Sequence, residues 1–277
     1  MNNNSIGGAA PESAAPVKSN RKKRIILIVV MILLVGTLCF SLWKFFSEYI
    51  PQQKEQERFA QLRDLIDDIP PERPTGEDEA GVPQETTESR YAKLLAMNPD
   101  MRGWLRIPDT AIDYPVMKND AERGEYYLHR DFDGYYSFAG CLFIGQNCDE
   151  DSDIFVIYGH NMNNGSMFGD LDRYGYFDYA LEHRDIIFDT ADEHRVYRVF
   201  AVFRTQVVDK DSDAFKYYES VGDFDEYAYS DVISQYKYMS MIDIGEEPEY
   251  PAQIMLLSTC AYHTENGRFV VAAYRIE

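Results

Sequence analysis

The chain has 277 residues, and its 47 acidic against 27 basic side chains give a formal net charge of -20. This balance argues against nucleic acid as a partner, because phosphate backbones are bound by clustered Lys and Arg. Hydrophobic residues make up 45% of the sequence, which is enough for a real core, and the four cysteines are too few for a disulfide scaffold.

The N-terminal part of the chain contains a long apolar run. No charged residue occurs from Ile25 to Trp43, a length close to the ~20 residues that cross the ~30 Å hydrocarbon core as a helix. A cleaved signal peptide would have a shorter apolar core and a small-residue cleavage site, and a buried soluble helix would not be apolar on every side. We therefore expect one uncleaved transmembrane helix over residues 25–43.

Four consecutive basic residues precede this helix, at 21–24. The positive-inside rule then predicts a cytoplasmic tail over residues 1–24 and an extracellular location for everything after Lys44, in a single-pass membrane protein. Residues 44–69 read as an amphipathic stalk helix, and residues 70–90 as an acidic, proline-rich linker with little to bury. Together, 44–90 would connect the membrane to a folded domain over residues 91–277.

The pattern from Tyr91 onward is one of short strands with short helices inserted. We expect eight strands, at residues 103–107, 111–117, 141–145, 153–159, 185–190, 194–205, 253–259 and 268–276. Helices are expected at residues 91–99, 166–175, 177–184 and 224–235. Because strands and helices do not alternate regularly, the fold class is mainly β, an antiparallel or mixed eight-stranded barrel.

A cysteine and an arginine stand at the ends of the last two predicted strands. Cys260 closes an apolar run, and Arg268 opens the next one. If the two strands are neighbours, the guanidinium returns close to the thiol and can stabilise an oxyanion formed when the thiolate attacks a carbonyl. Taken alone, however, such a cysteine is usually a small core residue, and such an arginine a solvated edge residue.

A thiol with a reference pKa of about 8.5 needs a base or a cation to become a nucleophile. His160 is the candidate, because it stands at the end of a buried strand, after a glycine and before a polar loop. The other histidines are expected at the surface, since several lie among charged residues, and His263 occupies a loop that offers no rigid positioning.

Several motifs resemble those of sortases, in the same order along the chain. LLSTC at 256–260 and RFVV at 268–271 resemble the cysteine and arginine strands of that family. YGHNM at 158–162, MFGDL at 167–171 and GWLRIPDTAIDYPVM at 103–117 are similar to segments of class B sortases, and the long stretch at 206–252 stands where that class carries an extra helix. The resemblance covers residues 91–277 and implies a sortase-type β-barrel.

This resemblance implies a cysteine transpeptidase (a thiol-protease type of hydrolase) on a Gram-positive cell surface, with His160, Cys260 and Arg268 as catalytic residues. Cys260 would form a thioacyl intermediate with a threonine of a sorting motif related to LPxTG or NPxTN, carried by surface proteins. The acceptor would be an amine of a peptidoglycan precursor or a pilin lysine, so wall anchoring and pilus assembly both stay open. Neither a cofactor nor a metal is implied.

Some finer assignments follow from the same resemblance. Ser258, Thr259 and Asn161 would bind substrate, although Ser258 and Thr259 could equally do no more than end a strand. Some class B members carry an acidic residue two positions after the cysteine, where this chain has Tyr262. The carboxylate that would orient His160 is therefore unassigned, with Glu265 as a possible neighbour.

Three alternatives belong to other classes. A papain-like wall hydrolase would place its histidine far after the cysteine, whereas only His263 follows Cys260. A zinc site built from Cys260, His263, Cys141 and Cys148 fits no closed-finger spacing. A non-enzymatic adhesion module would keep its function without the Cys260 thiol. Cys141 and Cys148 could also pair with each other outside the cell, but are interpreted as incidental.

Overall fold

A computed structural model describes residues 21–67, 87–121, 124–245, 247–262 and 264–277. The chain divides into two compact units, Met1–Ile50 and Pro51–Glu277. The first helix, α1 (Arg21–Asp67), contributes to both units. Residues 1–20 of the expected tail (1–24), the last two residues of the expected stalk (68–69) and residues 70–86 of the expected linker (70–90) lie outside the described residues.

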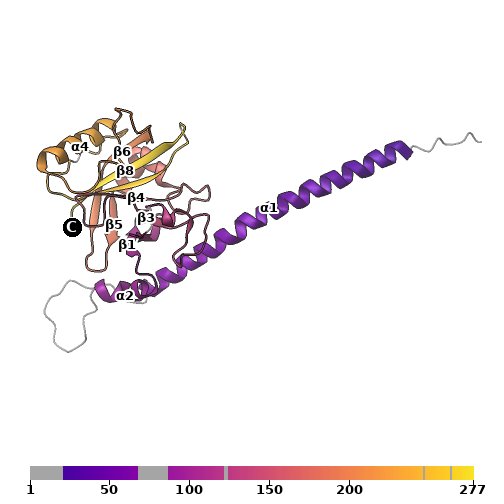
Figure 1. The fold of residues 1–277 in the computed structure, drawn as a ribbon, viewed down its shortest axis with the longest axis horizontal. Coiled ribbons are helices and arrows are strands. Elements are labelled where there is room, and N and C mark those ends of the chain that lie inside the picture. Colours follow the sequence, from indigo (N-terminus) through magenta and orange to yellow (C-terminus); the bar gives the residue numbers. More distant parts are fainter. Residues whose placement is uncertain (1–20, 68–86, 122–123, 246, 263) are drawn as a thin grey trace, which may run out of the picture. The chain divides into compact units, whose positions relative to one another are not determined.

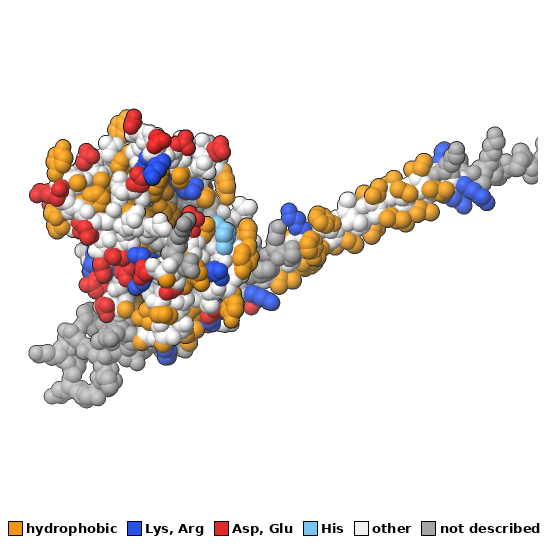
Figure 2. Space-filling model, viewed as in Figure 1, with side chains coloured by type: hydrophobic (Ala, Val, Ile, Leu, Met, Phe, Trp, Pro, Cys, Tyr) orange, Lys and Arg blue, Asp and Glu red, His pale blue; other side chains and the backbone are white. Residues whose placement is uncertain are grey.

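The first unit contains an apolar stretch of α1. Lys23–Phe46 is long and apolar enough to span a membrane, and among the described residues it is the one helix with these properties. Its large hydrophobic side chains, from Ile25 to Phe46, are exposed, and orange side chains predominate on the face of this helix that Figure 2 shows. The helix expected over residues 25–43 lies within this stretch.

The second unit is built on a closed eight-stranded β-barrel, which confirms the expected fold class (Figure 1). Its strands follow one another around the barrel in the order β1-β2-β3-β4-β7-β8-β6-β5. The strands are β1 (Met101–Arg106), β2 (Asp113–Met117), β3 (Leu142–Ile144), β4 (Ile154–Tyr158), β5 (Asp185–Asp189), β6 (Val196–Gln206), β7 (Ile254–Cys260) and β8 (Gly267–Arg275).

Most neighbouring strands are antiparallel, but two pairs, β2 with β3 and β4 with β7, are parallel. The central strands β4 and β7 are buried along almost their whole length. This explains why both read as continuous apolar runs in the sequence rather than as alternating ones. Because β4 and β7 are parallel neighbours, both strands end at the same rim of the barrel.

α2 (Thr87–Met97) precedes the first strand, and short helices lie in the connections between strands, namely η1 (Tyr126–His129), η2 (Leu171–Gly175), α3 (Phe177–Glu182) and α4 (Glu226–Met239). The helix expected over 224–235 begins two residues later, because the Asp225 side chain accepts a hydrogen bond from the Ala228 N–H at 2.9 Å and so caps α4. α4 packs on β6, within the long insert between β6 and β7 (Figure 1). The sequence patterns did not predict η1.

The C-terminal part of α1 is a component of the folded unit. Phe59, Leu62 and Ile66 are buried at 2% exposure or less, and the Phe59 ring meets the Tyr114 ring of β2 edge-on at 5.1 Å. The folded unit therefore begins at Pro51, before the expected start at Tyr91. The spacing of these three apolar residues puts them on one face of the helix, as the amphipathic pattern predicts. The pattern alone does not indicate which part of the protein covers that face.

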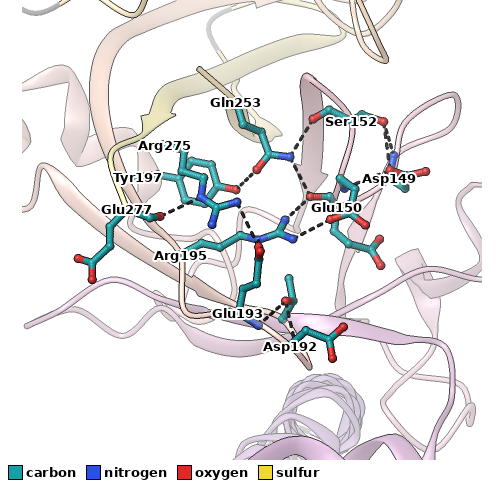
Figure 3. A network of polar contacts seen from close by, with 12 residues as sticks. Asp149, Glu150, Ser152, Asp192, Glu193, Arg195, Tyr197, Gln253, Arg275 and Glu277 are labelled. Atoms are coloured by element: carbon teal, nitrogen blue, oxygen red, sulfur yellow. Dashed lines mark hydrogen bonds and ion pairs between the residues drawn. The ribbon is translucent and has the colours of Figure 1, made fainter. Parts of the chain in front are cut away.

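A polar network closes one end of the barrel (Figure 3). The buried guanidinium of Arg195 donates from Nε to Glu193 at 2.7 Å, from Nη2 to Asp151 at 2.6 Å, and from Nη1 to the Glu150 carbonyl. Gln253 at the start of β7 accepts from the Tyr197 hydroxyl at 2.6 Å and donates to the Glu150 carbonyl at 3.0 Å. These groups gather where β6 and β7 begin and β8 ends.

Candidate functional site

The predicted cysteine and arginine face each other on neighbouring strands, at the end of the barrel opposite the Arg195 network. β7 and β8 are antiparallel, and in their register Cys260 is paired directly with Arg268. Opposed residues of an antiparallel pair have Cβ atoms about 4.5–5.5 Å apart. The expectation that the two strands are neighbours and bring the guanidinium to the thiol is thus met by the strand pairing. Both side chains are partly exposed.

His160 comes to the same rim on the other side of Cys260. β4 is parallel to β7, and Tyr158 is paired with Ser258, so two further residues along each chain lead to His160 and Cys260. Three hydrogen bonds continue the pairing beyond β4. The Gly159 N–H donates to the Ser258 carbonyl at 3.2 Å, the Thr259 hydroxyl to the Gly159 carbonyl at 2.8 Å, and the Asn161 amide to the Cys260 carbonyl at 2.8 Å. The imidazole, thiol and guanidinium therefore belong to three adjacent chain segments.

The imidazole of His160 is held by the loop between β2 and β3. Its Nε2 lies 2.9 Å from the Leu128 carbonyl oxygen. Because a carbonyl only accepts, Nε2 carries the proton, and in the neutral ring Nδ1 is the free base. The Phe138 ring lies parallel to the His160 ring, at an interplanar angle of 3° with centroids 6.4 Å apart.

The environment of His160 favours the neutral ring. Burial lowers its pKa from the ordinary value, the hydrogen bond to the Leu128 carbonyl opposes this effect, and the nearby His129 adds to the lowering. A base that is neutral at physiological pH can accept a proton from a thiol without first losing one of its own.

The Arg268 guanidinium is tied to the start of its own strand. Its Nη1 donates to the carbonyls of Gly267 at 3.0 Å and Asn266 at 3.3 Å. Burial raises the pKa of Tyr158 and of Tyr217, and the positive charge of Arg268 opposes the rise at both. The positive charge therefore acts on tyrosines of β4 and of the insert between β6 and β7.

The other expected binding residues are either buried or hydrogen-bonded to the backbone of a neighbouring chain segment. Ser258 is fully buried, with its hydroxyl 2.7 Å from the Tyr217 hydroxyl, and Thr259 is 2% exposed. Asn161 and Thr259 both bond β4 to β7, as described above. Any influence of Ser258 and Thr259 on substrate would therefore pass through their neighbours, and a substrate-binding role for the three residues stays a prediction.

The partner of His160 is a backbone carbonyl. Among the described residues no carboxylate is hydrogen-bonded to this ring, and Glu265 is exposed. Tyr262, which stands where some class B sortases have an acid, is 81% exposed. The Leu128 carbonyl takes the orienting place that the resemblance left unassigned.

The structure also corrects one expectation about the histidines and adds a neighbour of His160 that the sequence did not predict. His183 is not a surface residue: it is buried, and its Nδ1 lies 3.1 Å from the Pro108 carbonyl. His129 is exposed as expected, but its ring lies 5.3 Å from the ring of His160. The sequence signal that could have drawn attention to it is the aromatic cluster YYLH directly before a glycine-containing loop.

Cys141 and Cys148 are buried, free thiols. Burial raises the pKa of both, to about 11 for Cys148, so neither is a ready nucleophile. Among the described residues no group of three or more His, Cys, Asp or Glu could hold a metal ion, and His263 lies outside them.

Comparison with known proteins agrees with this geometry. The family model of the Sortase domain matches residues 105–276. Sortase B of Listeria monocytogenes is 33% identical over 186 residues, 64% of this chain and 70% of the relative, and sortase B of Staphylococcus aureus is 25% identical over 248 residues, 87% and 93% of the two chains. The chain therefore belongs to the sortase family, whose members are cysteine transpeptidases.

Solved structures show the same fold. Sortase B of Bacillus anthracis in complex with AAEK1 superposes with a TM-score of 0.66 at 24% identity, covering 83% of this chain and 99% of that chain. A complex of Staphylococcus aureus sortase B with substrate gives a TM-score of 0.68 at 22% identity, covering 82% and 99%. Together with the two sortase B relatives, these likenesses place the chain in class B.

Proposed function

We propose that this chain is a membrane-anchored class B sortase that cleaves a threonine-containing sorting motif through a thioacyl intermediate on Cys260. The substrate would be the sorting signal of a surface protein, related to LPxTG or NPxTN. The acceptor would be an amine of a peptidoglycan precursor or a pilin lysine. The fold shared with Staphylococcus aureus sortase B, which was solved as a complex with substrate, supports this proposal.

One observation carries the proposal. The register of three adjacent chain segments brings His160, Cys260 and Arg268 to one end of the barrel, with Cys260 in the middle. A nucleophile flanked by a base and a cation is the arrangement that acyl transfer needs, because attack on a carbonyl both releases a proton and creates an oxyanion.

The first half-reaction acylates the thiol. As Sγ of Cys260 attacks the threonine carbonyl, Nδ1 of His160 takes the thiol proton, since Nε2 is already bonded through its own proton to Leu128. Collapse of the tetrahedral intermediate breaks the C–N bond, and the imidazolium returns the proton from Nδ1 to the departing amine. A thioester on Cys260 remains, and His160 is neutral again.

The second half-reaction reverses these roles. The acceptor amine attacks the thioester and gives a proton to Nδ1 of His160, which passes it to the departing sulfur of Cys260. In both tetrahedral intermediates, the guanidinium of Arg268 faces the negative oxygen from β8. Atoms and charge balance without a metal or an external oxidant.

The apolar part of α1 supplies the anchor in this proposal. Its length and composition fit one membrane crossing. The basic residues at 21–24 favour a cytoplasmic N-terminus, which leaves the catalytic unit outside the cell, where sorting signals and wall precursors meet.

The test is cleavage of sorting peptides by the full-length protein and its variants. Cys260→Ala should abolish cleavage. His160→Gln should lose about 10²–10⁴-fold in kcat, and Arg268→Ala about 10²–10³-fold. The matched control is Cys148→Ala, which removes a buried thiol outside the site and should leave cleavage intact. Cleavage at wild-type rate by Cys260→Ala would exclude the proposal, and supplying a peptidoglycan-like amine or a lysine peptide identifies the acceptor.

A further inference from the structure

A second histidine is built into the site next to His160. The last turn of η1 ends in the dipeptide Leu128-His129, and both of its residues contact the His160 ring. Leu128 does so through its carbonyl oxygen, 2.9 Å from Nε2, and His129 through its ring, 5.3 Å away at an interplanar angle of 35°. One short segment therefore contacts the imidazole twice, through a hydrogen bond to Nε2 and through a contact between the two rings.

His129 is itself held in place. Its other neighbour is Tyr136, whose ring is stacked with the His129 ring at 6.3 Å and 25°. The Ser137 N–H donates to the His129 carbonyl at 3.1 Å, and Arg130 and Tyr136 form an isolated β-bridge. With Phe138 on His160, these residues form a row of four rings, which we call the ring row: Tyr136, His129, His160 and Phe138.

We propose that His129 is a positioning residue for His160, which holds the catalytic imidazole in its working orientation and, when protonated, repels positive charge on it. The inference rests on the proposed role of His160 in acyl transfer. Its basis is the ring geometry, together with the position of His129, which is exposed while His160 is half-buried.

The other charged and titratable groups around His160 come from β7, β8, the loop between β2 and β3, and α1. Cys260 lies at the end of β7, and Arg268 lies near the start of β8. On the loop between β2 and β3, the Arg130 guanidinium lies 4.7 Å from the Tyr126 ring and donates to the Gly134 carbonyl.

Below the loop lie two acids, Asp131 and, from α1, Glu55. Burial raises the pKa of both, and each stands close enough to an acid to raise it further. The pKa of His160 is lowered chiefly by burial, and the neighbouring His129 lowers it further.

Two substitutions separate packing from charge. His129→Phe keeps a ring of similar shape and removes the charge, whereas His129→Ala removes both. The matched control is His194→Phe, the same change at a partly exposed histidine in the turn between β5 and β6, at the opposite end of β6 from the residue that pairs with Arg268.

The direct measurement is an NMR titration of the histidine ring signals in the full-length protein in detergent micelles, with the His160 signal assigned by its loss in His160→Gln. Removing a neighbouring cation favours the protonated form, so the His160 midpoint should rise in His129→Phe and stay at the wild-type value in His194→Phe. The acid limb of the kcat profile should move to higher pH in the same variant.

The kinetic measurement tests positioning. His129→Ala should lower kcat at the pH optimum by about two- to tenfold, the worth of one aromatic contact, with KM unchanged, and His129→Phe should restore most of that loss. An unmoved His160 midpoint in His129→Phe, or a wild-type kcat in His129→Ala, would overturn the proposal. The titration needs no turnover, so a protein that cleaves no sorting peptide but shows the midpoint shift would refute the proposed function alone.

Discussion

At the scale of single residues, the loop that holds His160 depends on a glycine. Gly140 has φ of +62°, and a Cβ at this position would stand 2.3 Å from the Leu128 carbonyl oxygen and 2.5 Å from that of Tyr127. The Leu128 oxygen is the acceptor for Nε2 of His160. Only a residue without a side chain lets the backbone at position 140 approach so closely the oxygen that fixes the tautomer of the His160 ring.

Gly140→Ala should consequently lower kcat even under conditions in which the variant remains folded. The strained backbone and the clash should cost about 1–3 kcal/mol of unfolding free energy, and displacement of the Leu128 carbonyl should lower kcat in addition. Gly222→Ala is the control, because Gly222 has φ of +105° but lies beside the Asn147 carbonyl, near the start of β4. Thermal unfolding and peptide cleavage measure both quantities, and equal kcat losses in the two variants would contradict the account.

The candidate catalytic residues could be found from the sequence, but their support could not. Cys260 and Arg268 end and begin apolar runs, so strand pairing alone predicts that they meet. Leu128, His129 and Phe138 lie between β2 and β3 in a segment without strand or helix periodicity. The course of such a segment is set by tertiary contacts, so no local pattern reports that it reaches His160.

At the scale of elements, the C-terminal part of α1 supports the same loop from outside. Arg58 makes a two-pronged ion pair with Asp133, with both N–O distances at 2.7 Å, and Glu55 lies beside the Ser137 hydroxyl and the Phe138 and Ala139 N–H groups. This stretch of α1 therefore secures the segment that carries Phe138, in addition to burying its apolar face on the barrel.

If this stretch is part of the folded unit, Leu62→Ala should destabilise the barrel. Leu62 is fully buried, and truncating such a leucine costs about 2–5 kcal/mol. Glu57→Ala, on the exposed face of the same helix, should change the free energy of unfolding by less than ~0.5 kcal/mol. Chemical denaturation followed by tryptophan fluorescence, with Trp43 replaced so that the buried Trp104 reports, measures both. A stalk independent of the barrel would leave the Leu62→Ala midpoint unchanged.

The strands were the most predictable elements. All eight expected strands are present, with ends within two residues of the expected ones, because apolar runs bounded by polar turns are a local signal. The expected domain start at Tyr91 missed residues 51–67 of α1, because no local signal shows what this part of the helix packs on. Phe59, Leu62 and Ile66 define an apolar face, but Tyr114, which the Phe59 ring contacts, lies far away in the sequence, on β2.

At the scale of the whole molecule, the barrel separates a stabilising end from a reactive end. The Arg195 network ties together the starts of β6 and β7 and the end of β8 (Figure 3), whereas the candidate site occupies the other ends of the same strands. At the first end the guanidinium of Arg195 is buried and paired with partly exposed carboxylates, and at the second the thiol of Cys260 and the guanidinium of Arg268 are partly exposed.

Arg195→Ala should therefore affect stability and spare catalysis. Arg195 is buried but its partners Asp151 and Glu193 are partly exposed, so the loss of its charged hydrogen bonds should cost about 1.5–3 kcal/mol. Lys237→Ala, which breaks the exposed pair with Glu247, should cost about 0–1 kcal/mol. The kcat of Arg195→Ala, measured below its unfolding temperature, should equal that of wild type. A loss of kcat in the folded variant would show that the two ends are coupled.

The same network predicts a pH dependence of stability. Ion pairing with Arg195, strengthened by Arg275, lowers the pKa of Glu193. A carboxyl with a depressed pKa in the folded state stabilises the protein above its unfolded pKa, and this contribution is lost as pH falls through the folded value. The stability difference between wild type and Arg195→Ala should thus shrink in acid.

The measurement that tests the central arrangement most directly is intact-protein mass spectrometry of the full-length chain mixed with a sorting peptide. The account predicts an adduct with the mass of the acyl fragment, located by peptide mapping on Cys260, released by hydroxylamine and by an acceptor amine, and slow to form in His160→Gln. An adduct on another residue, or turnover of the peptide with no adduct on Cys260 at any time, would contradict it.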